Sequence, residues 1–117
     1  MLLGAVFSQK EELPLLKDNL LTTLSSVDKE FSVSFELFVT KHTSGDWRSV
    51  VHLTTGGNYG QHGTRIPGVW LNKDNQLHVE SSVNDNHDHR YHYHEPMIEG
   101  RWYRIEIDQV KTDEKVW

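Results

Sequence analysis

Residues 31–39, FSVSFELFV, decide the fold, because apolar and polar side chains alternate along them. An alternation with a period of two puts every second side chain on the same side of an extended chain. One side of this segment is apolar throughout and comprises Phe31, Val33, Phe35, Leu37 and Val39. The segment therefore predicts a β-strand that buries one face in a core.

Other segments show the same kind of pattern. Residues 47–55, WRSVVHLTT, are rich in β-branched and aromatic side chains and end at a glycine pair that predicts a turn. TRIPGVWLN and QLHVESSV flank the polar turn NKDN and predict a hairpin, with Pro67 at the start of its strand. RWYRIEIDQV, residues 101–110, alternates again. The one helical candidate lies in residues 8–24, but it contains weak helix formers, so we predict a loop there followed by a strand over residues 19–27. The chain is predicted to be all-β, an antiparallel β-sandwich.

Length and composition exclude several functions. The 117 residues suffice for one domain and carry a formal net charge of −5, so the chain has no electrostatic attraction to nucleic acid or to an anionic membrane. No apolar stretch approaches the roughly 20 residues that span a bilayer, and we expect no membrane insertion. The absence of cysteine excludes disulfides and thiolate metal sites. Residues 1–27 are predicted to be a leader or a first strand, with a signal-peptide remnant at residues 1–8.

Together the strand segments resemble the laminin G-like domain, a member of the concanavalin A-like jelly-roll superfamily. The resemblance covers residues 28–117. It rests on the FSVSF strand, the VHL segment at 51–53, the polar turn of the hairpin from Asn72 to Val79, and a final strand with Gly100, Trp102, Tyr103, Ile105 and Ile107. Domains of this kind are normally longer, so we expect the chain to be truncated at its C-terminus and to leave strand edges unpaired.

The resemblance implies a non-catalytic, extracellular recognition domain that binds a glycan or a matrix or cell-surface protein. Calcium is the cofactor that it implies, with Asp46, Asn58, Asp74 and Asp85 as candidate ligands. Two alternatives stay open. The chain is either a relative of glycoside hydrolases, active or degenerate, or a fragment or subunit that completes its sandwich by forming an oligomer through its unpaired edges.

The hydrolase alternative depends on paired carboxylates. Related jelly-roll hydrolases carry three on one strand, and this chain offers Glu106 and Asp108. Val110 and Lys111 stand where the third would lie, so no acid is placed to protonate a leaving sugar. We therefore interpret the two carboxylates as a charged solvent face and expect no enzyme activity.

A glycine-rich loop, residues 54–68, is the predicted ligand-binding region. Its glycines permit tight bends, and the amide, phenol and guanidinium groups between them suit the hydroxyls and ring faces of a sugar. The alternative is an ordinary connection between strands. Trp47 and Trp70 are interpreted as lining a core or a cleft. The predicted ligand-binding residues are Asn58, Tyr59, Gln61, His62 and Arg65.

Four of the eight histidines lie between residues 87 and 94. If this segment is a strand, His92 and His94 share one face with Asp88 and Arg90. Two imidazoles on one face can hold zinc, copper or nickel, so His92 and His94 are candidate metal ligands. Two histidines fall short of the four ligands of a structural zinc site. The alternatives are a solvent-facing strand or loop, or a contact that responds to pH.

Overall fold

The computed structural model describes residues 14–15, 20–27, 30–40, 46–83 and 86–110. Within them the chain forms six strands and no helix, and so no helix that could cross a membrane. The strands are β1 (Phe31–Phe38), β2 (Arg48–His52), β3 (Gly68–Leu71), β4 (Gln76–Val83), β5 (Asn86–Pro96) and β6 (Trp102–Gln109).

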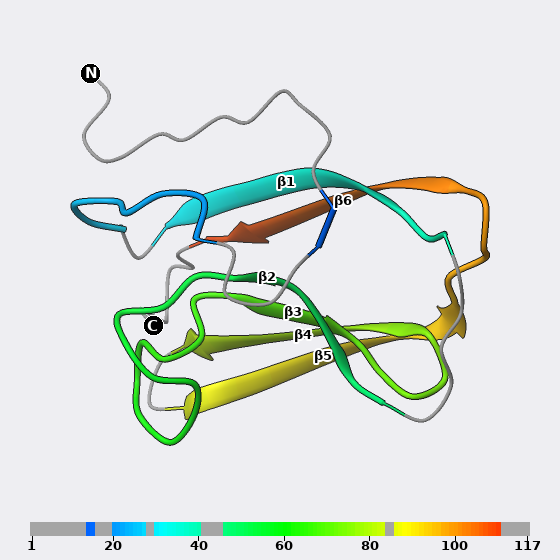
Figure 1. Cartoon of the computed structure of the whole chain (residues 1–117). Helices are drawn as coiled ribbons and strands as arrows, with labels where there is room; N and C mark the ends of the chain where they lie inside the picture. The colour runs from blue at the N-terminus through cyan, green and yellow to red at the C-terminus, as the bar shows by residue number, and fades with distance from the viewer. Residues whose placement is uncertain (1–13, 16–19, 28–29, 41–45, 84–85, 111–117) are drawn as a thin grey trace.

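The strands form two antiparallel sheets, one lying over the other (Figure 1). β1 pairs with β6 along its whole length, from Phe31 opposite Gln109 to Phe38 opposite Trp102. The larger sheet has the order β2-β3-β4-β5, in which every neighbouring pair is antiparallel. The predicted antiparallel β-sandwich is confirmed.

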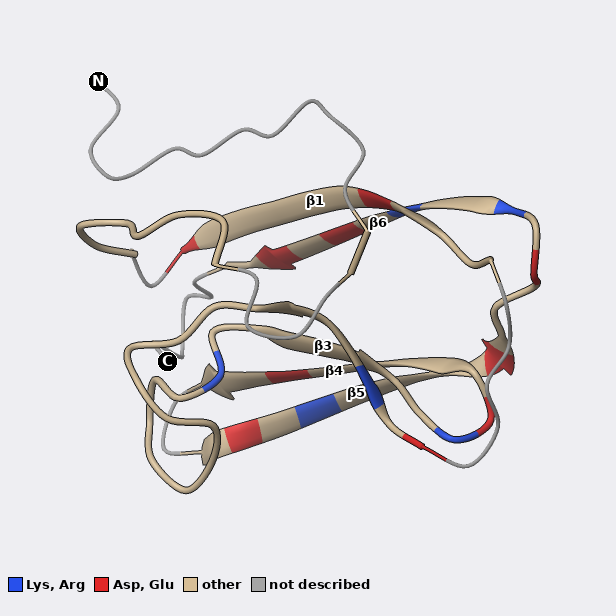
Figure 2. Ribbon diagram, in the orientation of Figure 1, with Lys and Arg blue, Asp and Glu red and all other residues tan. Residues whose placement is uncertain are grey.

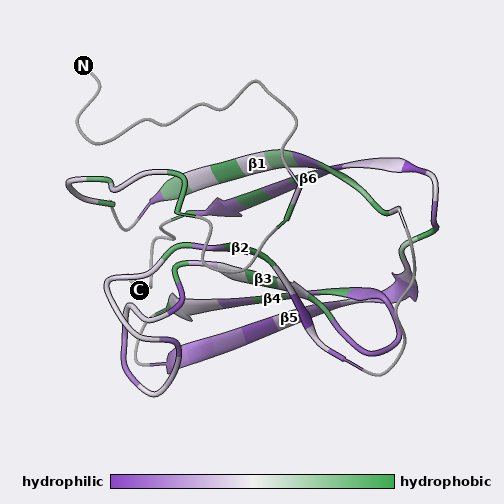
Figure 3. Ribbon diagram, viewed as in Figure 1, coloured by the Kyte–Doolittle hydropathy of each residue, from purple (hydrophilic) through white to green (hydrophobic). Residues whose placement is uncertain are grey.

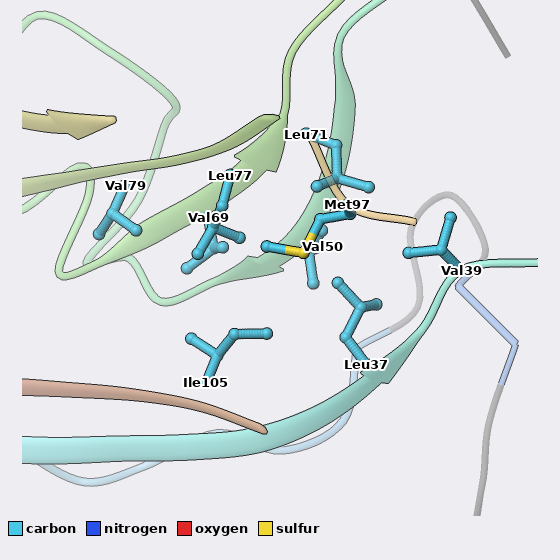
Figure 4. Close-up of a cluster of buried hydrophobic side chains, with 9 residues drawn as sticks. All are labelled: Leu37, Val39, Val50, Val69, Leu71, Leu77, Val79, Met97 and Ile105. Atoms are coloured by element: carbon cyan, nitrogen blue, oxygen red, sulfur yellow. The ribbon is translucent and has the colours of Figure 1, made fainter. Parts of the chain in front are cut away.

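The core lies between the two sheets, and the alternation along the strands determines which side chains enter it. Every second residue of β1 points inward: Phe31, Val33 and Phe35 are partly buried and Leu37 is buried, as is Val39 just past the strand. The predicted inner face of residues 31–39 is thus confirmed. Figure 4 shows side chains from both sheets meeting in this space. The buried apolar residues are Leu37, Val39, Val50, Val69, Leu71, Leu77, Val79, Met97 and Ile105.

The predicted hairpin forms between β3 and β4, and asparagines close its turn. Asn72 Oδ1 accepts hydrogen bonds from the backbone N–H groups of Asp74 and Gln76, both at 2.9 Å. Asn75 adopts a left-handed φ of 64°, which asparagine tolerates better than most residues. Its buried amide donates to Met97 O at 2.6 Å, so the turn is tied to the end of β5.

One sequence prediction is wrong. Residues 20–27, the described part of the strand predicted over 19–27, form no strand. Leucines and threonines occur there in adjacent pairs, so neither side of an extended chain would be apolar. Leu20 is 80% exposed as a result. The predicted signal-peptide remnant at residues 1–8 lies outside the described residues.

Candidate functional site

The four-stranded sheet has a second side, facing away from the core, and this side carries the candidate site. On β3, Val69 and Leu71 enter the core, so Trp70 between them points outward. On β4 the same alternation points His78 and Glu80 outward. Trp70 lies directly opposite His78 in the ladder, which places these groups side by side.

These side chains line a hollow of about 340 Å³. β3 and β4 form its floor, and Arg90 on β5 lines it from the next strand. Two further residues come from outside the strands, one just before β2 and one from the loop between β2 and β3. The lining residues are Trp47, Arg65, Trp70, His78, Glu80 and Arg90.

Glu80 is the electrostatic centre of the hollow. Its side chain is 7% exposed and forms an ion pair with Arg65, whose side chain is 13% exposed. Its other oxygen, Oε1, lies 2.8 Å from His78 Nε2 and 3.5 Å from Arg90 Nε. A buried carboxylate is strongly disfavoured unless cations and donors surround it, and here three side chains supply them.

The Arg65 guanidinium contacts two aromatic rings. Its Cζ lies 4.6 Å from the ring centroid of Trp70 and 4.9 Å from that of Tyr59. Its Nε donates to Asn58 O at 2.7 Å. Stacking on the two rings and the ion pair with Glu80 fix the guanidinium group in one orientation. Arg65 therefore organises the hollow and connects it to the glycine-rich loop.

His78 has one ring nitrogen engaged and one without a partner. Because the Glu80 carboxylate can only accept, the 2.8 Å contact assigns the proton to Nε2 and leaves Nδ1 as an acceptor. Nδ1 is buried, and no donor among the described residues reaches it. Burial lowers the pKa of His78 below its ordinary value of 6.5, and His92 and Arg90 lower it further, against an opposing effect of Asp88. The imidazole is therefore neutral at pH 7.

The Trp70 ring lies along its own strand, over Gly68. A Cβ built on Gly68 would meet Trp70 Cη2 at 2.1 Å, closer than two such atoms can approach. Glycine at position 68 is therefore required by the indole above it, and the PGVW segment places that ring in the hollow.

Arg90 and Trp47 form the exposed part of the hollow. Arg90 donates to Asp88 Oδ2 from Nη2 at 2.7 Å and from Nε at 3.1 Å, and this hydrogen bonding raises its pKa. Its side chain is nevertheless 59% exposed. Trp47 is 50% exposed and contacts the His78 ring edge-on, with centroids 4.9 Å apart. Both groups are available to a ligand.

The structure brings together only part of the predicted ligand-binding set. Arg65 lines the hollow and Tyr59 stacks on it, whereas Asn58 takes part through its carbonyl oxygen. Gln61 also uses its carbonyl, which accepts from the N–H and hydroxyl of Thr64 and closes the loop. His62 is exposed in the same loop.

His78, Glu80 and Arg90 were missed as site residues. A signal for the first two was present in QLHVESSV, where a histidine and a glutamate alternate with core residues on a strand between two other strands. Polar groups at such positions need partners, and the partners define a site.

The metal candidates are not gathered into a centre. The described residues contain no group of three histidine or acidic side chains arranged to hold an ion. His92 lies opposite His78 in the ladder, and their ring centroids are 6.3 Å apart. The His94 side chain is 82% exposed, and its Nε2 lies 3.8 Å from Glu95 Oε1. His92 and His94 remain candidates for zinc, copper or nickel. The calcium candidates Asp46, Asn58 and Asp74 likewise remain predictions, and Asp85 lies outside the described residues.

Glu106 and Asp108 are exposed residues of β6, in the two-stranded sheet. Their neighbours Ile105 and Ile107 face the core, so both carboxylates point away from the core and into solvent. This is the charged solvent face that the sequence predicted.

Comparison of the chain with models of protein families, with curated proteins and with solved structures finds no match.

Proposed function

We propose that this chain is a non-catalytic, extracellular recognition domain of the laminin G-like, jelly-roll kind that its sequence resembles. In this proposal the hollow on the outer side of the four-stranded sheet binds a glycan of the matrix or cell surface. The observation that carries the proposal is the combination of an exposed indole with a ring of planar, charged hydrogen-bonding groups on a rigid sheet.

The aromatic lining suits a sugar ring. Trp47 offers half of its surface, and the apolar face of a pyranose can cover it without loss of its hydroxyl hydrogen bonds. A volume of about 340 Å³ falls at the lower end of the range for small-molecule sites, as for a short saccharide rather than a protein surface.

The charges of the hollow favour an uncharged sugar. Arg65 and Arg90 are balanced by Glu80 and Asp88, and His78 is neutral at pH 7. An acidic sugar would have to compete with a buried carboxylate for its arginine, at a cost of several kcal/mol. Hydroxyl groups can use the free N–H groups of an exposed guanidinium without breaking any pair.

A binding screen with a matched pair of variants tests the proposal. Trp47→Ala removes the exposed indole of the hollow. Trp102→Ala removes an indole of nearly the same exposure, 52% against 50%, from the other sheet. Immobilised neutral and acidic glycans and matrix proteins are offered to all three proteins, with calcium or with EDTA. We expect binding to a neutral glycan that falls by about tenfold in Trp47→Ala, about 1.4 kcal/mol, and is unchanged in Trp102→Ala.

Three results would contradict the proposal. The first is that no glycan or matrix protein binds in either condition. The second is an equal loss of affinity in both variants, which would place the ligand elsewhere. The third is release of reducing sugar from the bound glycan, which would make the chain an enzyme. Recovery of a tagged protein inside cells and not in the medium would refute the extracellular location.

A further inference from the structure

β5 forms one edge of the four-stranded sheet and leaves one side of its backbone without a partner strand among the described residues. It is the longest strand, with 11 residues, and residues 89–96 are exposed on both faces. Figure 3 shows that it is hydrophilic along its length. The opposite edge strand, β2, has only five residues and a register shift within them. Short, irregular edges resist pairing, whereas long ones invite it.

We propose that β5 pairs with β5 of a second copy of this chain, antiparallel and centred on Tyr91, to give one continuous eight-stranded sheet. Its register with β4 is regular from His89 to His92 and shifts on either side, so a further strand can pair most easily over this stretch.

The sequence of β5 is complementary to itself in this register. With Tyr91 opposite Tyr91, the numbers of facing residues add to 182. Asp88 then faces His94 of the second copy, Glu95 faces His87, and Arg90 faces His92. The two-fold axis repeats each pair, so an acid stands opposite a histidine at four positions. Glu95 is exposed, whereas the Asp88 side chain is 8% exposed and also accepts from Arg90. Figure 2 shows acidic and basic residues together along this strand.

Neighbouring registers lose this match. If the numbers of facing residues add to 180 instead of 182, Arg90 faces Arg90 of the second copy. If they add to 183, Asp88 faces Glu95. Like charges directly opposite each other destabilise a pair of strands. Two aromatic rings add to the preference, because Tyr91 is 58% exposed and Tyr93 is 39% exposed in the single chain. In the proposed register Tyr91 meets its own copy and Tyr93 faces His89.

Disulfide trapping tests both the pairing and its register, because the natural chain has no cysteine. Residues directly opposite in an antiparallel pair have Cα atoms about 4.5–5.5 Å apart, within the range that a disulfide spans. Tyr91→Cys should therefore cross-link to itself. Tyr93→Cys is the matched control, since four residues along the axis separate its two copies by roughly 13 Å. Both positions are exposed, and circular dichroism of the reduced proteins checks that each variant folds.

We expect the 117-residue chain to sediment as a dimer of twice 13.6 kDa at neutral pH. Under mild oxidation Tyr91→Cys should form a covalent dimer at least about tenfold faster than Tyr93→Cys. A monomer at all concentrations would overturn the proposal. A dimer in which Tyr93→Cys cross-links as fast as Tyr91→Cys would also overturn it, because the chains would then pair in another register or through another surface.

Discussion

Replacement of Glu80 by glutamine is the most direct test of the charge arrangement in the hollow. The substitution keeps the shape of the side chain and removes its charge. Arg65, which is 13% exposed and paired with Glu80, then loses its nearest anion. Asp88 Oδ1, 3.7 Å from Arg65 Nη1, supplies only part of the compensation.

The expected loss follows from the burial of this pair. Removal of one member of a buried ion pair costs about 3–5 kcal/mol, because the other charge stays buried without a counter-ion. Since Asp88 remains close, we expect the lower end, about 3 kcal/mol. With a urea m-value of about 1–3 kcal/mol per molar, the midpoint of unfolding should fall by about 1–3 M.

Urea unfolding of five proteins, the wild type, Glu80→Gln, Arg65→Met, the double variant of both and Glu106→Gln, measures this loss and its origin. Glu106→Gln is the control, because that carboxylate is exposed and its loss should change stability by at most about 0.5 kcal/mol. The double variant with Arg65→Met and Glu80→Gln replaces the ion pair by uncharged groups. It should lose less free energy of unfolding than the two single variants lose together. A loss below about 1 kcal/mol in Glu80→Gln, or strictly additive losses in the double variant, would refute the account of a buried, mutually dependent pair.

Three further predictions concern the same sheet. Because the pKa of His78 lies below 6.5 in the folded protein, the unfolded chain binds its proton first as the pH falls, so the free energy of unfolding should decrease below about pH 6.5. The urea midpoint should fall more between about pH 7.5 and pH 5.5 in the wild type than in His78→Gln. A smaller fall in the wild type than in the variant would show that Glu80 raises the pKa of His78 instead. Gly68→Ala should displace the Trp70 ring, lower stability by about 1–3 kcal/mol and change the tryptophan fluorescence, whereas an unchanged spectrum would contradict the close packing. If both proposals hold, the cross-linked Tyr91→Cys dimer should bind an immobilised polysaccharide more tightly than the reduced protein does when it is diluted until it sediments as a monomer. A short soluble saccharide should bind equally well to both, and an equal gain for both ligands would argue against two separate hollows.

The fold could be predicted because its information is local. An alternation such as that of residues 31–39 states which side of a strand is buried, and a polar turn such as NKDN states where the chain reverses. The segment at residues 19–27 failed for the same reason, since adjacent leucine and threonine pairs give no apolar side and propensity alone does not make a strand.

The hollow was harder to predict because it is assembled across strands. Nothing in the sequence places Arg65 against both Tyr59 and Trp70, because these contacts depend on how a loop of glycines folds back over β3. Nor does the sequence state that Glu80 meets Arg90, which requires the register of β4 with β5. The glycine-rich loop was a reasonable prediction, yet Arg65 is its one residue that lines the hollow, and the strands provide most of the other lining residues.

The core and the hollow are two consequences of one pattern. β4 carries Leu77 and Val79 on its inner side and His78 and Glu80 on its outer side, and all four are buried. A slip of one residue in its pairing would turn the histidine and the glutamate into the apolar core and the two aliphatic side chains out of it. The burial of the apolar set thus fixes the register of β4. That register in turn places His78 opposite Trp70 and Glu80 opposite Arg90, in positions fixed by the pairing of β4 with β3 and β5. A polar arrangement held in this way is preorganised, so a ligand that enters the hollow does not have to order it.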